Sequence, residues 1–232
     1  MPAAGCVAAL LLHGAGAGGW EWGAWRGVFE AAGIAVAAPD LAPAPAGLAA
    51  TRWQDYAAQA AAQLAALPRP RAVVGASLGG LLALQVAGNA DALVLVNPLP
   101  PSPWHALLAG RAARDDAGIV PWGRDARLAG TVRAMPDADP VSRLHAFRRW
   151  RDESGAVLRE AYAGEVLPRP AVRALCLASE ADGDVPAAAT QAVAAWLGAD
   201  LLRLPGASHV GPLLGRRAAA VAGRVADWLS AP

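Results

Sequence analysis

A single hydroxyl residue, Ser77, stands where two apolar runs of the sequence meet. The first run, residues 72–74, is short and largely β-branched, which is typical of a buried strand. The second run, residues 78–87, has the length and the Leu/Ala/Gln content of a buried helix. Glycines two residues before and two residues after Ser77 would let the strand turn directly into the helix without crowding. The serine hydroxyl would then project above the sheet as a nucleophile, and a serine that only caps the helix is the weaker alternative.

A serine needs a base to accept its proton, and the sequence contains four histidines. His13 lies in a glycine-rich loop, where we expect it to hold the loop together. His105 and His145 lie in a proline-rich middle region, where a surface or packing role is the default. His209 directly follows the last predicted strand and would project from the carboxyl edge of the sheet. We therefore interpret His209 as the base.

An acid must orient the imidazole, and the loop after the fifth predicted strand offers three carboxylates. They are Glu180, Asp182 and Asp184. A serine, acid and histidine in that chain order suit a sheet of this kind. The spacing of the residues alone leaves all three carboxylates open as the partner of His209.

Backbone N–H groups must stabilise the negative charge that develops on the attacked carbonyl oxygen. The N–H of Leu78, at the start of the predicted helix, points to that position. We expect the second donor from the glycine loop at residues 13–19, at Ala15.

The elements that must position these groups alternate along the chain, which favours a parallel sheet with helices on both faces. The predicted strands are residues 6–12, 34–38, 72–74, 91–96, 172–178 and 201–204, and the predicted helices are residues 20–32, 53–67, 78–87, 187–197 and 213–229.

The alternation stops at Leu99 and resumes near residue 171. We expect residues 1–98 and 171–232 to form the two parts of an α/β core, and residues 99–170 to form a helical lid inserted between them. The lid shows four helical patches, at residues 105–115, 124–133, 141–150 and 156–165, and no strand pattern. Its tryptophans Trp104, Trp122 and Trp150 are candidates for binding an apolar substrate, unless they only pack the lid onto the sheet.

The composition excludes several classes of function. A chain of 232 residues with a formal net charge of +1 has no basic field for nucleic acid, and all of its Lys and Arg residues are arginines. No apolar run reaches the ~18 residues of a membrane span. The apolar start lacks a basic region, which predicts a cytoplasmic protein rather than a signal peptide. Cys6 and Cys176 fall in strands that two others separate, so we expect free, buried thiols.

Four motifs together resemble the α/β-hydrolase superfamily over the whole chain. LLLHGAGAGGWEW is similar to the oxyanion loop and first helix of small esterases and hydroxynitrile lyases related to plant methyl esterases, and GASLGG to the nucleophile elbow. EADGDVP resembles the acid loop, where the acid usually precedes a proline by four residues. That resemblance implies Asp182, four residues before Pro186. PGASHVGP resembles the histidine loop and implies His209.

The resemblance implies a doubly wound, mostly parallel sheet of about six strands that lacks the superfamily's N-terminal hairpin. It also implies a serine hydrolase that cleaves a carboxylic ester of a small or medium hydrophobic substrate through an acyl-enzyme. We expect no metal and no cofactor; the oligomeric state is not predicted. The alternatives are a thioesterase acting on an acyl-carrier or acyl-CoA thioester and a non-catalytic receptor. A hydroxynitrile lyase is disfavoured, because such lyases resemble one another in a lid lysine that this chain lacks.

Overall fold

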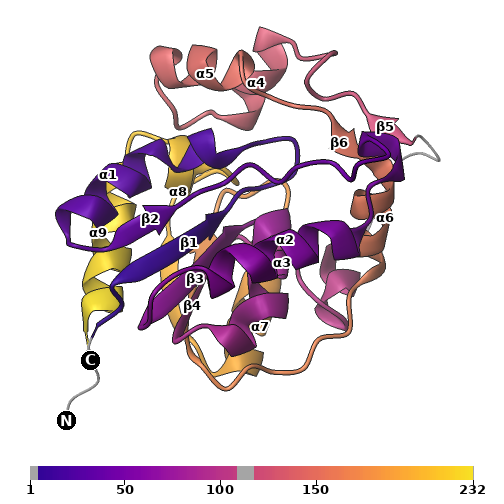
Figure 1. The fold of residues 1–232 in the computed structure, drawn as a ribbon. Helices are drawn as coiled ribbons and strands as arrows, with labels where there is room; N and C mark the ends of the chain where they lie inside the picture. Colours follow the sequence, from indigo (N-terminus) through magenta and orange to yellow (C-terminus); the bar gives the residue numbers. More distant parts are fainter. Residues whose placement is uncertain (1–4, 109–117, 232) are drawn as a thin grey trace.

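The structure, a computed structural model, describes residues 5–108 and 118–231. Its centre is a sheet of six strands in the order β2-β1-β3-β4-β7-β8, in which every neighbouring pair is parallel (Figure 1). These strands are β1 (Ala8–Leu12), β2 (Ala35–Ala37), β3 (Arg71–Ala76), β4 (Ala92–Val96), β7 (Arg173–Ser179) and β8 (Asp200–Leu204). The predicted doubly wound parallel sheet is therefore confirmed.

Helices cover both faces of the sheet, as its apolar central strands require. Every residue of β1, β3 and β4 is buried. One face packs against α1 (Gly23–Ala31) and α9 (Ala218–Ser230) (Figure 1). The other packs against α2 (Trp53–Ala65), α3 (Leu78–Val86) and α7 (Ala187–Leu197). A strand buried on both faces reads as a continuous apolar run, which is why these strands could be predicted from sequence.

The strand order reverses between β1 and β3, because the chain first adds β2 on one side of β1 and then β3 on the other. Ligands of open parallel sheets bind beside such a switch point, at the carboxyl ends of the strands. His13 follows β1, Ser77 follows β3, and the loops after β7 and β8 carry Asp182 and His209. The topology therefore brings the candidate residues to one edge.

The chain between β4 and β7 is here called the inserted segment, and much of it lies over this edge (Figure 1). Its described elements are η4 (Trp104–Leu108), β5 (Ile119–Val120), α4 (Leu128–Ala134), α5 (Pro140–Phe147), β6 (Glu153–Ser154) and α6 (Gly155–Ala163). The expectation of no strand here was wrong, because β5 and β6 form an antiparallel pair. Two-residue strands are too short to show any periodicity in sequence. Most of the patch predicted at residues 105–115 lies outside the described residues.

Two predicted helices are each divided. The helix expected at residues 213–229 is a short α8 (Gly211–Leu214) followed by α9, with extended backbone at Gly215 between them. The helix expected at residues 20–32 begins as the 3-10 turn η1 (Gly19–Trp22) before α1. Both breaks occur at or beside a glycine, which lowers the cost of leaving the helical conformation.

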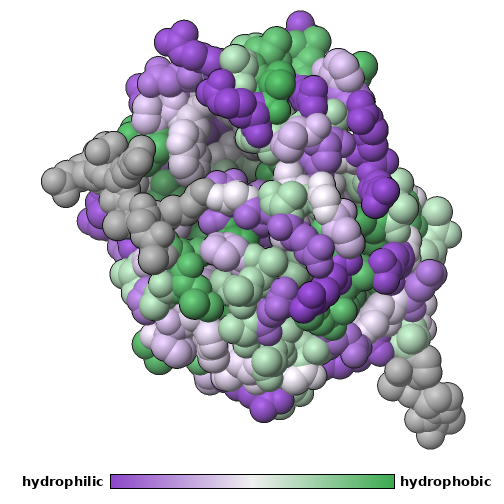
Figure 2. All heavy atoms as spheres, turned by 180° about the vertical axis from the view of Figure 1, so that it is seen from behind, coloured by the Kyte–Doolittle hydropathy of each residue, from purple (hydrophilic) through white to green (hydrophobic). Residues whose placement is uncertain are grey.

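The sequence predicts two free, buried thiols and no membrane span. Cys6 and Cys176 are buried and unpaired. Among the described helices, none has the length and apolarity that crossing a membrane requires. Apolar side chains are nonetheless exposed on α4 and α5, where Figure 2 shows hydrophobic atoms at the top of the molecule; they include Leu128, Val132, Val141 and Leu144.

Candidate active site

Ser77 occupies a strained turn between β3 and α3. Its backbone has φ 51° and ψ −117°, a region that residues other than glycine rarely adopt. A Cβ on Gly75 would lie 2.0 Å from the carbonyl oxygen of Gly79, and one on Gly79 would lie 2.2 Å from that of Leu12. Both flanking glycines are therefore required by close backbone approach, as the sequence predicted. The turn sets Ser77 at the N-terminus of α3, where the helix dipole favours negative charge.

His209 and Asp182 form a hydrogen-bonded pair beside this turn. The two side chains meet at 2.7 Å between His209 Nδ1 and Asp182 Oδ2. The side chain of Asp182 is fully buried and that of His209 is 12% exposed. Asp182 Oδ1 accepts the backbone N–H groups of Asp184 at 2.7 Å and Val185 at 2.8 Å. The carboxylate is thus held with one oxygen turned to the imidazole.

The other two carboxylates of this loop have different surroundings. Glu180 is exposed and lies 3.9 Å from Arg203 in a surface ion pair. Asp184 is exposed but lies at the cavity, with its carboxylate within 4.8 Å of the ligating atoms of His209 and Asp182. Those three residues have the chemistry of a metal site, yet both Asp182 oxygens already accept hydrogen bonds. The arrangement fits a charge partner for the imidazole better than a metal centre.

Burial would lower the pKa of His209, but the hydrogen bond and charge of Asp182 outweigh it. The charge of Asp184 acts in the same direction, so the pKa of His209 is raised above its usual value. An imidazole of this kind holds a proton more readily than free histidine, which suits a group that must carry one during a reaction.

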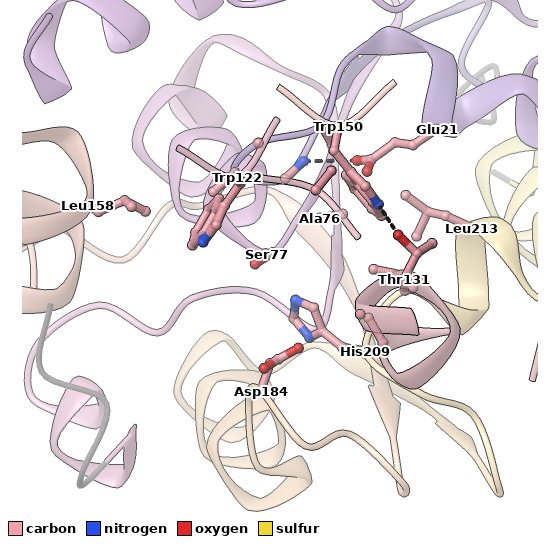
Figure 3. Close-up of a pocket in the computed structure, with 18 of the residues that line it drawn as sticks. Glu21, Ala76, Ser77, Trp122, Thr131, Trp150, Leu158, Asp184, His209 and Leu213 are labelled. Atoms are coloured by element: carbon pink, nitrogen blue, oxygen red, sulfur yellow. Dashed lines mark hydrogen bonds between the residues drawn. The ribbon is translucent and has the colours of Figure 1, made fainter. Parts of the chain in front are cut away.

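Ser77 and His209 line one cavity of about 430 Å³ at the carboxyl edge of the sheet. In Figure 3 the hydroxyl of Ser77 and the ring of His209 face the same space. Among the described residues, no hydrogen bond joins the two side chains. Such contacts are commonly long in the absence of substrate and tighten when it binds.

The loop after β1 uses several of its N–H groups to hold its own structure. Gly14 donates its N–H to Glu21 Oε1 at 2.8 Å, and Gly16 donates its N–H to Glu153 Oε2 at 3.0 Å. Within the described parts of the chain, the N–H groups of Ala15 and Leu78 have no acceptor. These are the two N–H groups that the sequence predicts to stabilise an oxyanion.

The inserted segment fixes that loop from the opposite side. Arg151 donates its backbone N–H to Gly16 O at 2.7 Å and its Nε–H to Ala17 O at 2.7 Å. The same guanidinium lies 3.2 Å from Asp40. Together with Glu153, Arg151 ties the inserted segment to the loop, so the loop is held by residues far away in sequence.

His13 has the structural role expected from sequence. Its Nε2 accepts the backbone N–H of Leu41 at 2.9 Å, and its Nδ1 lies 2.8 Å from Gly14 O. Burial lowers the pKa of His13 to about 4. The imidazole is therefore neutral near pH 7, and its contacts connect the loop after β1 to the loop after β2.

Two of the three candidate tryptophans line the cavity. Trp122 packs on the glycine loop, since a Cβ on Gly16 would lie 2.7 Å from its Cε3 atom. Trp150 donates its indole N–H to Thr131 Oγ1 at 3.0 Å (Figure 3). Trp104 lies elsewhere: its ring packs at 4.8 Å from that of Trp196, away from the cavity lining. Its position beside α7 explains why an aromatic residue in the inserted segment does not reach the site.

Several residues of the site escaped the sequence analysis. Asn97, after β4, donates to His209 O at 2.7 Å and to Ser179 Oγ at 2.9 Å, which anchors the histidine loop. Asp137, from the inserted segment, accepts the N–H and the hydroxyl of Ser208, one residue before His209. Glu21 lies inside the cavity wall. The available signal was a lone carboxylate between two tryptophans in an otherwise uncharged stretch.

Comparison with known proteins shows one family and many structural relatives. A family model described as "Alpha/beta hydrolase family" matches residues 9–224. Polyneuridine aldehyde esterase has a similar structure, with a TM-score of 0.71 and 18% identity over 96% of this chain and 97% of that one. A pyrethroid hydrolase from Sphingobium faniae JZ-2 also has a similar structure, with a TM-score of 0.71 and 21% identity over 97% of this chain and 98% of that one.

Tomato methylketone synthase I in complex with 2-tridecanone gives a TM-score of 0.73 at 17% identity, over 95% of this chain and 97% of that one. The curated protein sequences contain no significant match. At identities this low the structural likeness shows the fold alone.

Proposed function

The chain belongs to the alpha/beta hydrolase family, and we propose that within it the protein is a serine esterase that uses Ser77, His209 and Asp182. The family match confirms the superfamily expected from the four motifs, and the esterase and methylketone synthase structures agree with the plant esterase-like branch. One observation carries the proposal: a serine on a strained elbow lines the same cavity as a histidine that is hydrogen-bonded to a buried carboxylate.

The proposed reaction proceeds through an acyl-enzyme. Ser77 Oγ attacks the ester carbonyl carbon while His209 Nε2 takes the hydroxyl proton, and Asp182 stabilises the imidazolium. The N–H groups of Ala15 and Leu78 stabilise the oxyanion. Its collapse breaks the ester bond, and His209 returns the proton to the leaving alcohol.

Water then attacks the acyl group and gives a proton to His209. Collapse of the second oxyanion releases the carboxylic acid, and the proton returns to Ser77 Oγ. The sequence of steps uses only groups of the chain, the ester and water.

The cavity supports a small or medium hydrophobic substrate. Its volume of about 430 Å³ lies in the lower part of the range of small-molecule sites. Most of the lining is apolar and includes Leu99, Trp122, Trp150, Leu158 and Leu213. We expect nitrophenyl butyrate and octanoate to be hydrolysed faster than the acetate or the palmitate. The acetyl group would contact little of the apolar lining, and the palmitoyl chain would be too long for the cavity.

Labelling with a fluorophosphonate probe tests the proposal, because the probe reacts with an activated serine. We expect the wild-type protein to be labelled and Ser77→Ala to lose both labelling and ester turnover. Ser230→Ala is the matched control, because this exposed serine ends α9 far from the cavity in sequence and structure. Labelling that survives Ser77→Ala would refute the proposed nucleophile, and absent labelling and turnover would favour the receptor alternative.

An acyl-CoA thioester of the same chain length, assayed beside the oxygen ester, separates the two hydrolase alternatives. A higher kcat/KM for the oxygen ester supports the proposal. A clear preference for the thioester would replace it with a thioesterase.

A further inference from the structure

The cavity contains a carboxyl group that the proposed mechanism does not use. Glu21 lies in η1 and is 3% exposed, and its side chain lines the same cavity as Ser77 and His209. Its Oε1 accepts the N–H of Gly14 at 2.8 Å (Figure 3). Burying a carboxyl group costs free energy, because burial penalises its charged form.

The carboxyl lies next to the loop that presents the Ala15 N–H. A Cβ placed on Gly14 would be 3.4 Å from Ser77 Cβ and 4.0 Å from Glu21 Oε1. The nucleophile and the carboxyl therefore both lie close to the same point beside Gly14. Any charge on Glu21 would act directly on the oxyanion formed at Ser77.

The charged groups around Glu21 have other partners. His209 is bonded to Asp182, and the guanidinium of Arg151 contacts Asp40 and Ala17 O. Two more carboxylates hold the same loop from other elements, Glu153 at Gly16 N and Asp40 at Gly19 N.

Burial raises the pKa of Glu21 to about 8, although the Gly14 hydrogen bond and the charges of His209 and Arg151 act against it. The carboxyl is therefore protonated near pH 7.

We propose that Glu21 is a positioning residue for the ester hydrolysis proposed above: in its neutral form it holds the oxyanion loop, and its ionisation switches the site off at alkaline pH. In the neutral form the carbonyl oxygen accepts the Gly14 N–H, and the hydroxyl adds no charge to the cavity. In the ionised form a full negative charge lies beside the position where the oxyanion must develop. Like charges at short range in a poorly solvated cavity oppose that step strongly.

The proposal, which rests on the proposed function, predicts a fall in kcat/KM above about pH 8. If only the protonated form is active, its fraction at pH 9 is about one tenth, and kcat/KM falls about tenfold. Glu21→Gln keeps an oxygen for the Gly14 N–H and cannot ionise. We expect the kcat/KM of this variant, measured relative to its own value at pH 7, to lose the alkaline fall. Glu21→Leu removes the acceptor and should lower kcat at every pH.

The test compares pH profiles from 6 to 10 on nitrophenyl butyrate, corrected for spontaneous hydrolysis, with folding checked by thermal melting. Glu30→Gln is the matched control, because Glu30 is an exposed glutamate of α1 paired with Arg26. An alkaline fall in the wild type and Glu30→Gln that is absent from Glu21→Gln supports the proposal. A fall that persists in Glu21→Gln, or a wild-type profile that stays flat to pH 10, overturns it.

A second measurement keeps this proposal separate from the proposed function. Infrared difference spectra between pH 6 and pH 9.5 detect a protonated carboxyl without turnover. A carboxylic acid band that disappears at high pH in the wild type and is missing from Glu21→Gln supports the neutral form, even if fluorophosphonate labelling fails. A spectrum with no such band overturns it, even if the protein proves to be an esterase.

Discussion

Replacing Asp182 by asparagine tests how the imidazole is oriented. Oδ1 of Asp182 accepts two backbone N–H groups, from Asp184 and Val185, and Oδ2 faces His209 Nδ1. In Asp182→Asn the amide oxygen must stay with the two N–H donors, because an NH₂ group there would face them. The NH₂ group then points at His209 Nδ1 and forces that atom to accept. The ring proton moves to Nε2, which can no longer take the proton of Ser77.

The expected loss is about 10⁴-fold in kcat, the size seen when a triad carboxylate becomes an amide and selects the wrong tautomer. Asp184→Asn is the matched comparison on the same loop. Asp184 is exposed and affects His209 through its charge, which solvent screens. We expect Asp184→Asn to change kcat by less than about tenfold.

The assay is turnover of nitrophenyl butyrate at pH 8, with active protein counted by fluorophosphonate titration and folding checked by thermal melting. Equal losses in the two variants would mean that the orienting acid is misassigned. A loss below about tenfold in folded Asp182→Asn would refute the tautomer argument itself.

Three further predictions concern the same site. Because His209 must be neutral to act as a base and its pKa is raised, the acidic limb of kcat/KM should lie above pH 6.5, and Asp184→Asn should move it to lower pH. Asp137→Asn should lower kcat about tenfold by releasing Ser208 and the histidine that follows it, so an unchanged kcat would contradict a role for this contact. His13 binds a proton more weakly when folded, so it contributes stability above pH 6.5 that is lost as the pH falls towards 4. Urea unfolding should show roughly 3 kcal/mol of this loss, and His13→Gln should show a weaker pH dependence.

The fold was predictable because its signals are local. Continuous apolar runs mark strands buried on both faces, and the glycines around Ser77 mark a turn that tolerates no Cβ. The chain positions of Ser77, Asp182 and His209 follow from such runs, since each lies just after a strand of one parallel sheet.

The remaining features depend on distant parts of the chain meeting. Asn97 and Asp137 reach the histidine loop from other elements, and nothing in their sequence neighbours indicates this. Glu21 becomes informative only when the cavity around it is known. Trp104 packs against Trp196 of α7 because of the path that the inserted segment takes. That path leaves no periodic pattern in the sequence.

The contacts of Arg151 and Glu153 with the glycine loop have a consequence for remodelling this protein. In the esterase proposed above, the inserted segment lines the substrate cavity and also holds the loop that carries the Ala15 N–H. Exchanging the whole segment for that of a relative would remove the contacts of Arg151 and Glu153 with the glycine loop. The turnover of every ester would then fall, whatever the new substrate preference. Grafts that retain residues 151–153 and replace only the helices farther from the loop should change which esters are chosen while leaving the catalytic rate intact.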